Sequence, residues 1–365
     1  MKKQLVFLIL LFCVINGRAQ NEDIFKRKNI KNTMLKVVEW QLKNPKHDLK
    51  DWTNGAFYAG VFAAYETTKS KEVLTSLMEM GEKNNWQPSK RFDHADDIAI
   101  AQTYIDLYLL KKDRRMIEPT IDVIKRVQTE KSPEAEKNGI TWWWCDALFM
   151  APPVLAKLGE TLEDKSYFEL NDKLFRETYD LLYDKEENLF ARDASYLINE
   201  KGEGKREANG KKIFWSRGNG WVAGGLVRLL KELPKDYPKR AFYLSLYKEM
   251  MERIISLQQA DGLWRSSLLD PESFPGGEAS GSGFYTYALA WGVNNKILDR
   301  TKYLPAARRA WRGLNTLVSN EGRVGWTQPI GGNPRKNFNA ESWEVYGAGA
   351  FLRDGSEVVK LKLKN

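Results

Sequence analysis

The feature that most constrains the fold is a regular alternation of two kinds of helical segment along the chain. One kind is amphipathic and rich in charged residues, and its six members span roughly 24–43, 71–85, 112–130, 163–183, 237–259 and 301–318. The other kind is rich in Gly, Ala and aromatic residues, and its six members span roughly 54–69, 95–111, 146–159, 218–232, 281–298 and 340–353. A helix that is apolar nearly all round is buried, whereas an amphipathic helix covers it from outside. The alternation therefore predicts six helical hairpins.

Six such hairpins predict an all-α protein, an (α/α)6 barrel whose inner helices surround a common axis. An open α-solenoid is the alternative, because it also stacks helix pairs. A solenoid usually shows a residue-level repeat of fixed period, whereas the hairpins here vary in length and show none. The pattern favours a closed barrel, formed by residues 21–365 as a single domain.

Residues 1–20 are predicted to be a secretory signal peptide and are excluded from the fold. Lys2 and Lys3 precede an apolar run over 5–15, and Gly17 and Ala19 supply small residues for cleavage. The run is too short to span a bilayer. We therefore expect export across the inner membrane, cleavage near Ala19 and no membrane insertion afterwards.

Composition argues against several classes of partner. The chain carries a net charge of +9, and removal of the signal with its three basic residues leaves +6, spread over many helical faces. Because no single basic run is present, a nucleic-acid partner is not expected. The mature chain keeps two histidines and one cysteine, Cys145. An internal disulfide is therefore impossible, and we expect neither a metal site nor a cofactor.

The loops that precede the inner helices are the unusual ones. In a ring of hairpins all inner helices run in the same direction, so these loops meet at one end of the barrel. They carry aromatic residues, carboxylates and an arginine, and they span 51–54, 92–97, 141–146, 214–221, 274–282 and 328–340. The opposite loops are short. The topology therefore predicts a binding site at the end where the inner helices begin.

One of these loops places three consecutive tryptophans, Trp142, Trp143 and Trp144, just before Asp146. Aromatic faces bind the apolar faces of sugar rings, and a carboxyl group among them is poorly solvated, which raises its pKa. This environment suits a general acid that acts on a carbohydrate. Pro152 predicts that the regular helix begins near that residue, which leaves Asp146 at the end of the barrel. The alternative is a tryptophan-rich core segment whose aspartate caps a helix.

Asp96 and Asp97 open the helix expected over 95–111, and His94 precedes them. One interpretation is that an aspartate faces Asp146, because two carboxylates flank the glycosidic bond in most glycosidases. The other is that both acids complement the helix dipole. His94 is either a substrate ligand or base, or a structural hydrogen-bond partner.

The stretch Trp215–Trp221 contains more than a helix cap requires. Its glycines let the backbone approach a ligand, Arg217 suits bidentate contact with a carboxylate, and either tryptophan can stack on a ring. The alternative for Arg217 is a pair with an internal acid. In the glycine-rich loop over 276–283, Ser280 is expected to contact sugar hydroxyls or to cap a helix.

Three motifs resemble glycoside hydrolase family 105, the unsaturated rhamnogalacturonyl hydrolases, which are related to the unsaturated glucuronyl hydrolases of family 88. They are His94–Asp97, Trp143–Pro153 and Trp215–Trp221, and the resemblance extends from about Leu35 to Arg353. It implies an (α/α)6-barrel catalytic domain, in agreement with the alternation of helices. It also implies a glycoside hydrolase that acts on an oligosaccharide ending in a 4,5-unsaturated uronic acid, the product of a polysaccharide lyase.

The resemblance implies hydration of the C4=C5 double bond rather than attack at the anomeric carbon. An acid protonates C4, water adds at C5, and the resulting hemiketal opens and releases the aglycone. By motif, Asp146 is the general acid/base and Asp97 its partner, with Asp96 as the competing alignment. Arg217 holds the uronate carboxylate. The full set of residues expected to contact substrate is Trp52, Asn54, His94, Asp96, Trp143, Trp144, Asp193, Trp215, Arg217, Trp221 and Ser280.

Asp193 departs from the pattern of this family, because some members carry a histidine at the corresponding position. The departure leaves the aglycone open among rhamnogalacturonan, ulvan-type and arabinogalactan-derived fragments. Two other functions also stay open: a hydrolase of saturated glycans, and a non-catalytic glycan-binding protein. For an oligosaccharide substrate in a Gram-negative cell we expect a periplasmic enzyme, a monomer or weak dimer.

Overall fold

The helices of the computed structural model follow the predicted alternation over the residues that it describes, 23–361. The predicted signal peptide lies outside these residues. The outer helices are α2 (Arg27–Lys43), α4 (Lys71–Lys83), α7 (Glu118–Thr129), α11 (Lys165–Leu182), α13 (Arg240–Ser256) and α15 (Arg300–Thr316). The inner helices are α3 (Trp52–Thr68), α6 (Ala101–Lys111), α10 (Pro152–Leu162), α12 (Ser216–Glu232), α14 (Ala279–Asn294) and α16 (Val345–Val358).

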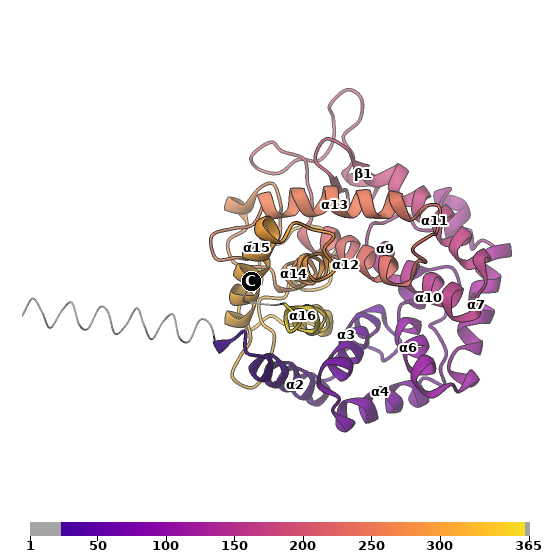
Figure 1. Cartoon of the computed structure of the whole chain (residues 1–365). Helices are drawn as coiled ribbons and strands as arrows, with labels where there is room; N and C mark the ends of the chain where they lie inside the picture. Colours follow the sequence, from indigo (N-terminus) through magenta and orange to yellow (C-terminus); the bar gives the residue numbers. More distant parts are fainter. Residues whose placement is uncertain (1–22, 362–365) are drawn as a thin grey trace, which may run out of the picture.

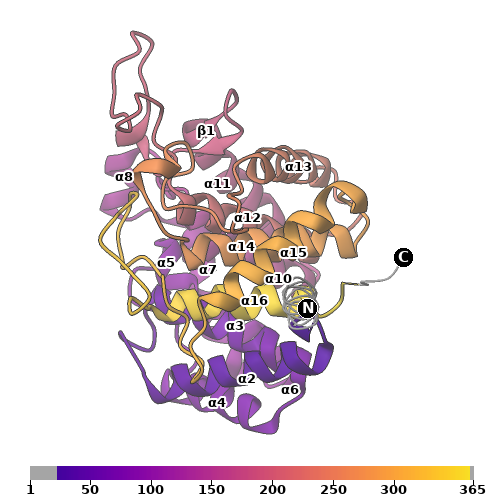
Figure 2. The ribbon, with the colours of Figure 1, turned by 90° about the vertical axis from the view of Figure 1, so that its left-hand side faces the viewer.

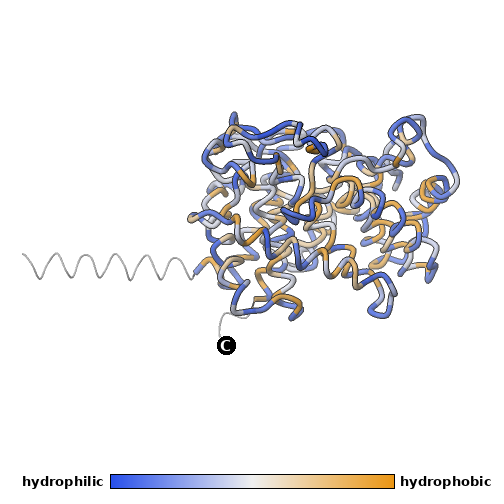
Figure 3. The backbone as a smooth tube through the Cα atoms, turned by 90° about the horizontal axis from the view of Figure 1, so that it is seen from above, coloured by the Kyte–Doolittle hydropathy of each residue, from blue (hydrophilic) through white to orange (hydrophobic). Residues whose placement is uncertain are grey.

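Burial separates the two sets as their compositions predict. In α14 every residue from Ala279 to Val293 is buried, and α3 is buried from Thr53 to Ala64. The outer helix α11 buries one face only, through residues such as Phe168 and Phe175. Hydrophilic stretches gather in the peripheral loops (Figure 3). The apolar segments therefore form the core because they can exclude water on all sides.

The inner helices form a closed ring (Figure 1). Each packs against the next in chain order, and the last, α16, packs against the first, α3. Glycines permit this closing contact: a Cβ atom built on Gly60 of α3 would lie 2.4 Å from the carbonyl oxygen of Gly349 in α16. The closed barrel is confirmed and the open solenoid is excluded, because a solenoid leaves its first and last repeats apart.

Two inner helices are interrupted where they begin. The four-residue α5 (Ala95–Ile98) precedes α6, and α9 (Ala147–Met150) precedes α10, which starts at Pro152 as expected. Small elements decorate the connections: α8 (Pro133–Asn138), the 3-10 turns η1 (Arg114–Met116), η2 (Ala194–Tyr196) and η3 (Pro271–Ser273), and the antiparallel pair β1 (Tyr183–Asp184) and β2 (Leu189–Phe190). Figure 2 shows the long loops gathered at one end of the barrel, away from the end of α16.

Two further findings concern the described part of the chain. None of its helices combines the length and the apolarity needed to cross a membrane. Within residues 23–361, His, Cys, Asp and Glu side chains nowhere form a group of three that could hold a metal ion.

Candidate active site

A cavity of about 280 Å³ lies at the end of the barrel where the inner helices begin. Five of the six predicted loops, or the helices that they enter, contribute to it, together with the segment that follows β2. Its lining consists of Trp52, Asp96, Trp144, Asp146, Met150, Arg192, Trp215, Ile330, Gly331 and Gly332. Aromatic faces with a few convergent charged groups are typical of a small-molecule site.

Asp146 lies immediately before α9, and its side chain reaches the cavity. Burial raises the pKa of this carboxyl, and the nearby guanidinium of Arg192 opposes that rise, with 3.6 Å between Arg192 Nε and Asp146 Oδ2. The neighbouring Cys145 thiol is fully buried, which raises its pKa and keeps it protonated. The environment expected for a proton donor is therefore present around Asp146.

Asp96 is the second carboxyl group in the cavity lining. It is carried by α5, which packs against α9, so the two aspartates belong to adjacent elements. Burial, and then the charge of Asp146, raise the pKa of Asp96 to about 8. Two coupled carboxyl groups in such a site titrate as a unit, and the first proton lost leaves the second harder to remove. The pair therefore retains a proton at neutral pH.

Asp97 does not line the cavity. Arg91 binds it with its backbone N–H (2.8 Å), its Nε (3.1 Å) and its Nη2 (2.6 Å). These bonds hold the Asp97 carboxylate against the loop before α5. The geometry therefore favours Asp96 over Asp97 as the residue that faces Asp146, because successive residues of a helical turn point in different directions.

His94 contacts residues that line the cavity but does not line it itself. Its ring lies 4.5 Å from the ring of Trp144, and its Nδ1 lies 4.0 Å from Asp96 and 3.9 Å from Asp97. Burial, with the charge of Arg91, lowers the pKa of His94 to about 4, so the imidazole is neutral at neutral pH. It is not part of the cavity lining. The structure therefore favours the positioning interpretation over the ligand interpretation.

Arg217 is fully buried and points into the loop over 328–331. It donates to the carbonyl oxygens of Gln328 (2.5 Å), Pro329 (3.0 Å) and Gly331 (3.4 Å), and its guanidinium stacks on Trp215 and Tyr346. The terminal nitrogens expected to hold a uronate carboxylate are therefore engaged with this loop, while the buried Nε of Arg217 has no hydrogen-bond partner. Arg217 instead shapes the cavity, because it fixes the backbone of Gly331 beside it.

Arg192 is the charged residue that sequence reasoning missed. A backbone bridge between Trp144 and Asp193, and the bond from Cys145 N–H to the Arg192 carbonyl, place the Arg192 side chain beside Asp146. Its Nη1 donates to Asp193 (2.7 Å), while its buried Nε has no hydrogen-bond partner. In the sequence, the one signal that could have identified Arg192 is its position next to Asp193, which was predicted to contact substrate.

Asp193 orients this arginine and lies outside the cavity lining. It also accepts a hydrogen bond from the backbone N–H of Ser195 (2.8 Å). Burial acts to raise the pKa of Asp193, but the hydrogen bonds from Ser195 and Arg192 hold this pKa below its usual value. A Cβ atom at Gly332 would lie 3.0 Å from Arg192 Nε, so this glycine permits the close approach.

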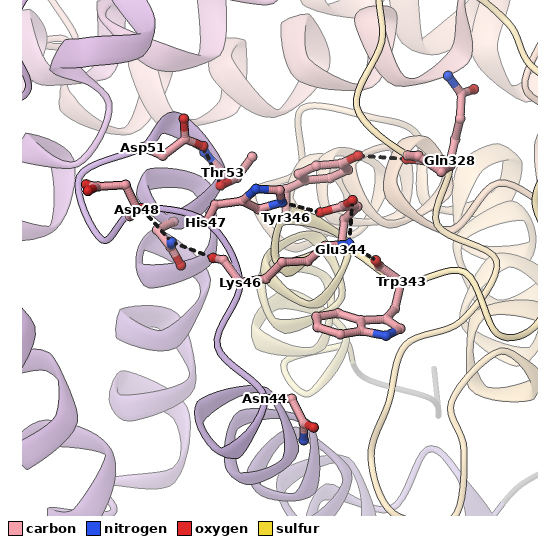
Figure 4. Close-up of polar contacts among 12 residues, drawn as sticks. Asn44, Lys46, His47, Asp48, Asp51, Thr53, Gln328, Trp343, Glu344 and Tyr346 are labelled. Carbon is pink, nitrogen blue, oxygen red and sulfur yellow. Dashed lines mark hydrogen bonds and ion pairs between the residues drawn. The ribbon is translucent and has the colours of Figure 1, made fainter.

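Trp52 and Trp215 provide the aromatic faces opposite the carboxyl groups. Trp52 stacks on Tyr346, with 5.2 Å between ring centroids and 18° between planes, and the Tyr346 hydroxyl donates to the Gln328 carbonyl (2.7 Å). Figure 4 shows this contact beside Glu344, which binds both Lys46 and His47 at 2.7 Å. The network joins the loop before α3 to the start of α16, which holds the stacked pair in place.

Four other residues expected at the substrate lie elsewhere. The amide of Asn54 donates to the carbonyl oxygens of Lys46 and Asp48, so it stabilises the loop. Trp221 is buried among other aromatic rings, and Ser280 is buried and bonded to Glu278 at the start of α14. Trp143 packs on Trp144 outside the cavity lining. Each of these four side chains therefore takes part in packing or capping and is absent from the lining of the cavity.

Comparison with known proteins agrees with the resemblance seen in the motifs. The model of Glycosyl Hydrolase Family 88 matches residues 26–362. A protein of Formosa agariphila named "Unsaturated 3S-rhamnoglycuronyl hydrolase" is 46% identical over 97% of this chain and 98% of its own.

Solved structures show the same fold. One from Bacteroides vulgatus, described as a glycosyl hydrolase of family 88, superposes with a TM-score of 0.84 at 29% identity, covering 92% of this chain and 100% of its own. Another, described as a polysaccharide lyase, superposes with a TM-score of 0.83 at 32% identity, covering 91% of this chain and 97% of its own.

Proposed function

The chain belongs to glycosyl hydrolase family 88, and from that premise we propose that it releases an unsaturated uronic acid from the non-reducing end of an oligosaccharide whose next residue is 3-sulfated rhamnose. The observation that carries the proposal is likeness to a hydrolase of this named specificity along almost the entire length of both chains. The cavity described above supplies what such a reaction requires: a protonated carboxyl group, a second carboxyl group and a cation for the uronate.

The carboxyl pair performs the proton transfers. Asp146, with Asp96 as its partner, donates a proton to C4 of the vinyl ether, and positive charge develops at C5. The resulting carboxylate accepts a proton from the water that adds at C5, which restores the pair. The hemiketal formed at C5 then opens and releases the aglycone. The raised pKa values of both aspartates favour the protonated form that begins this cycle.

Arg192 binds the carboxylate of the uronic acid in this proposal. Arg192 lines the cavity, and its buried Nε, 3.6 Å from Asp146 Oδ2, has no hydrogen-bond partner. A charge-assisted hydrogen bond from that atom orients the sugar, so that C4 and C5 lie beside the carboxyl pair. The ring then lies against Trp52, Trp144 and Trp215, whose faces suit the apolar side of a sugar.

The sulfate of the rhamnose has a candidate partner at the mouth of the cavity. Arg335 is exposed, and a Cβ atom built on the lining residue Gly331 would lie 2.8 Å from its Nη2. Its guanidinium is therefore at the edge of the cavity, beyond the position of the uronic acid. A planar guanidinium matches the geometry of a sulfate oxygen pair.

Ultraviolet absorbance of the conjugated ene-carboxylate tests the proposal. The enzyme is incubated with lyase digests of a 3-sulfated rhamnose–glucuronate glycan, of the same glycan after desulfation, and of rhamnogalacturonan from pectin. We expect absorbance to fall fastest with the sulfated digest and to stay constant with Asp146→Asn. A rise in absorbance on intact polymer indicates a lyase. Reducing ends released from saturated glycans, or binding without turnover, would support the two alternative functions.

We also propose that the protein is exported by residues 1–20 and acts in the periplasm as a monomer or weak dimer. The basic start at Lys2 and Lys3 and the apolar run that follows support export. Cell fractionation, mass spectrometry of the mature N-terminus and light scattering test these three statements. An uncleaved protein in the cytoplasm contradicts the first two, and a stable higher oligomer contradicts the third.

A further inference from the structure

A second cavity, about 340 Å³ in volume, lies at the opposite end of the barrel from the candidate active site. The C-terminal parts of inner helices α3, α6, α12 and α16 surround it, together with the middle of α10. Its lining includes Phe62, Asp106, Leu109, Lys157, Arg228 and Arg353. We call it the base cavity. It shares no lining residue with the active-site cavity.

Two buried arginines in the base cavity have unused donors. Arg353 is 4% exposed, and its Nε and Nη2 have no hydrogen-bond partner. Arg228 is 3% exposed; its Nε donates to Gln102 Oε1 (2.5 Å), but its Nη2 has no hydrogen-bond partner. The buried hydroxyl of Tyr287, close enough for the charges of both arginines to oppose the rise of its pKa by burial, also has no hydrogen-bond partner. Buried polar groups are rarely left without a hydrogen-bond partner, and several such groups close to one another indicate a missing ligand.

The three acids that line the base cavity, Glu66, Asp106 and Glu232, compensate these arginines only in part. Asp106 and Glu232 bind Lys157 at 2.5 and 2.9 Å, whereas Arg228 Nη2 lies 3.8 Å from Asp106. Within residues 23–361, Arg353 has no carboxylate within the 4.0 Å of an ion pair. Burial, and then the charge of Arg228, lower the pKa of Arg353 to about 10, which still leaves Arg353 charged at neutral pH. Four basic and three acidic side chains line the base cavity, so positive charge remains in excess there.

Helix dipoles do not account for these cations. Basic residues favour the last turn of a helix, where the carbonyl groups are unpaired, and the effect falls off beyond that turn. Lys231 fits this explanation at the end of α12. Arg228 lies four residues before the end of α12, and Arg353 lies five before the end of α16. Both arginines therefore lie further inside the barrel than the C-terminal ends of their helices.

The surroundings of the base cavity are strongly basic. Two further cavities, of about 330 and 820 Å³, adjoin it through the shared residue Lys231, and the smaller one also shares Arg353. Ten basic residues and four acidic residues line the three together. Basic residues therefore outnumber acidic ones around the base cavity, and this excess attracts anions toward the two arginines.

We propose that Arg228 and Arg353 bind an oxyanion in the base cavity: a sulfate, phosphate or carboxylate group, either free or carried by a sugar. Paired guanidinium groups hold such anions through several charge-assisted hydrogen bonds. The volume exceeds that of an inorganic ion, and Phe62, Leu109 and Leu110 offer apolar contact for a carbon skeleton. Leu109 and Leu110 both line the cavity and are exposed, so solvent reaches this side of it.

Crystals of the unmodified mature protein grown with selenate test the site directly. We expect an anomalous peak within hydrogen-bond distance of Arg228 and Arg353. A cavity that holds only water at saturating selenate overturns the proposal. Because this measurement needs no variant, it does not depend on whether an arginine substitution folds, and it is independent of the hydrolase activity.

Thermal unfolding at constant ionic strength distinguishes the sources of the anion. Sulfate, phosphate and glucuronate are titrated separately against the wild type, and we expect a saturable rise in Tm of about 3 °C with the preferred one. Arg353→Gln removes this rise, whereas Arg192→Gln in the active site and Lys131→Gln on the surface keep it. An equal rise in all four proteins reflects a general salt effect and contradicts the proposal.

Discussion

Asp96→Asn and Asp97→Asn change adjacent residues in the same isosteric way, and the geometry predicts opposite consequences for them. Asp96 lines the active-site cavity with Asp146, and its raised pKa leaves it protonated at neutral pH. An amide at this position can neither share the proton of the pair nor accept it. We expect kcat to fall by about 10²- to 10⁴-fold, the range typical of a lost acid–base group.

Asp97→Asn should leave kcat within a few-fold and lower stability instead. The substitution removes the charge that accepts three hydrogen bonds from Arg91. Hydrogen bonds to charged groups each contribute up to about 3 kcal/mol, but solvent screens this pair, because the Arg91 side chain is 53% exposed. We expect a loss of about 1 kcal/mol, which lowers Tm by about 2 °C in a chain of this size.

The assay follows loss of ene-carboxylate absorbance for both variants, beside Tm from circular dichroism. Asp146→Asn serves as the inactive reference, and the wild type sets kcat and Tm. The reasoning is refuted if Asp97→Asn abolishes turnover while Asp96→Asn retains it. Equal losses of kcat in both variants, with unchanged Tm, would show that the bond to Arg91 rearranges when substrate binds.

Three other predictions concern the same end of the barrel. Arg192→Gln should raise KM by about 10- to 100-fold, as expected for one lost charge-assisted contact, and an unchanged KM in initial-rate measurements removes this residue from uronate binding. Arg217→Gln should lower Tm by about 5 °C and expose the 328–331 loop to limited proteolysis, because buried carbonyl groups lose their donor; equal cleavage of both proteins contradicts this. The Asp96 carboxyl is protonated more in the folded than in the unfolded state between its ordinary pKa of 3.8 and about 8, so its effect on stability becomes less favourable as pH rises through that window. The Tm of the wild type should therefore fall relative to that of Asp96→Asn from pH 4 to pH 8; a constant difference rules out this assignment.

Much of the architecture follows from the chain itself. A segment such as 279–293 carries no charged side chain and can only be stable where other helices cover it on all sides. Its amphipathic neighbours supply that cover. Once six such pairs are recognised, hairpin topology places all inner-helix starts at one end of the barrel. The position of Asp146, after three tryptophans and before Pro152, then identifies the end where chemistry is expected.

The direction of individual side chains was decided by contacts between distant segments. Asp96 and Asp97 are equivalent in the sequence, and only the approach of Arg91 determines which one is withdrawn from the cavity. The sequence predicted Arg217 as a carboxylate ligand, but carbonyl groups more than 110 residues away accept hydrogen bonds from its Nη1 and Nη2. Arg192 reaches Asp146 because the segment after β2 pairs with the backbone at Trp144. Periodicity and composition report which face of a helix is buried. Which buried donor meets which acceptor depends on packing across the barrel, and only the tertiary structure determines that.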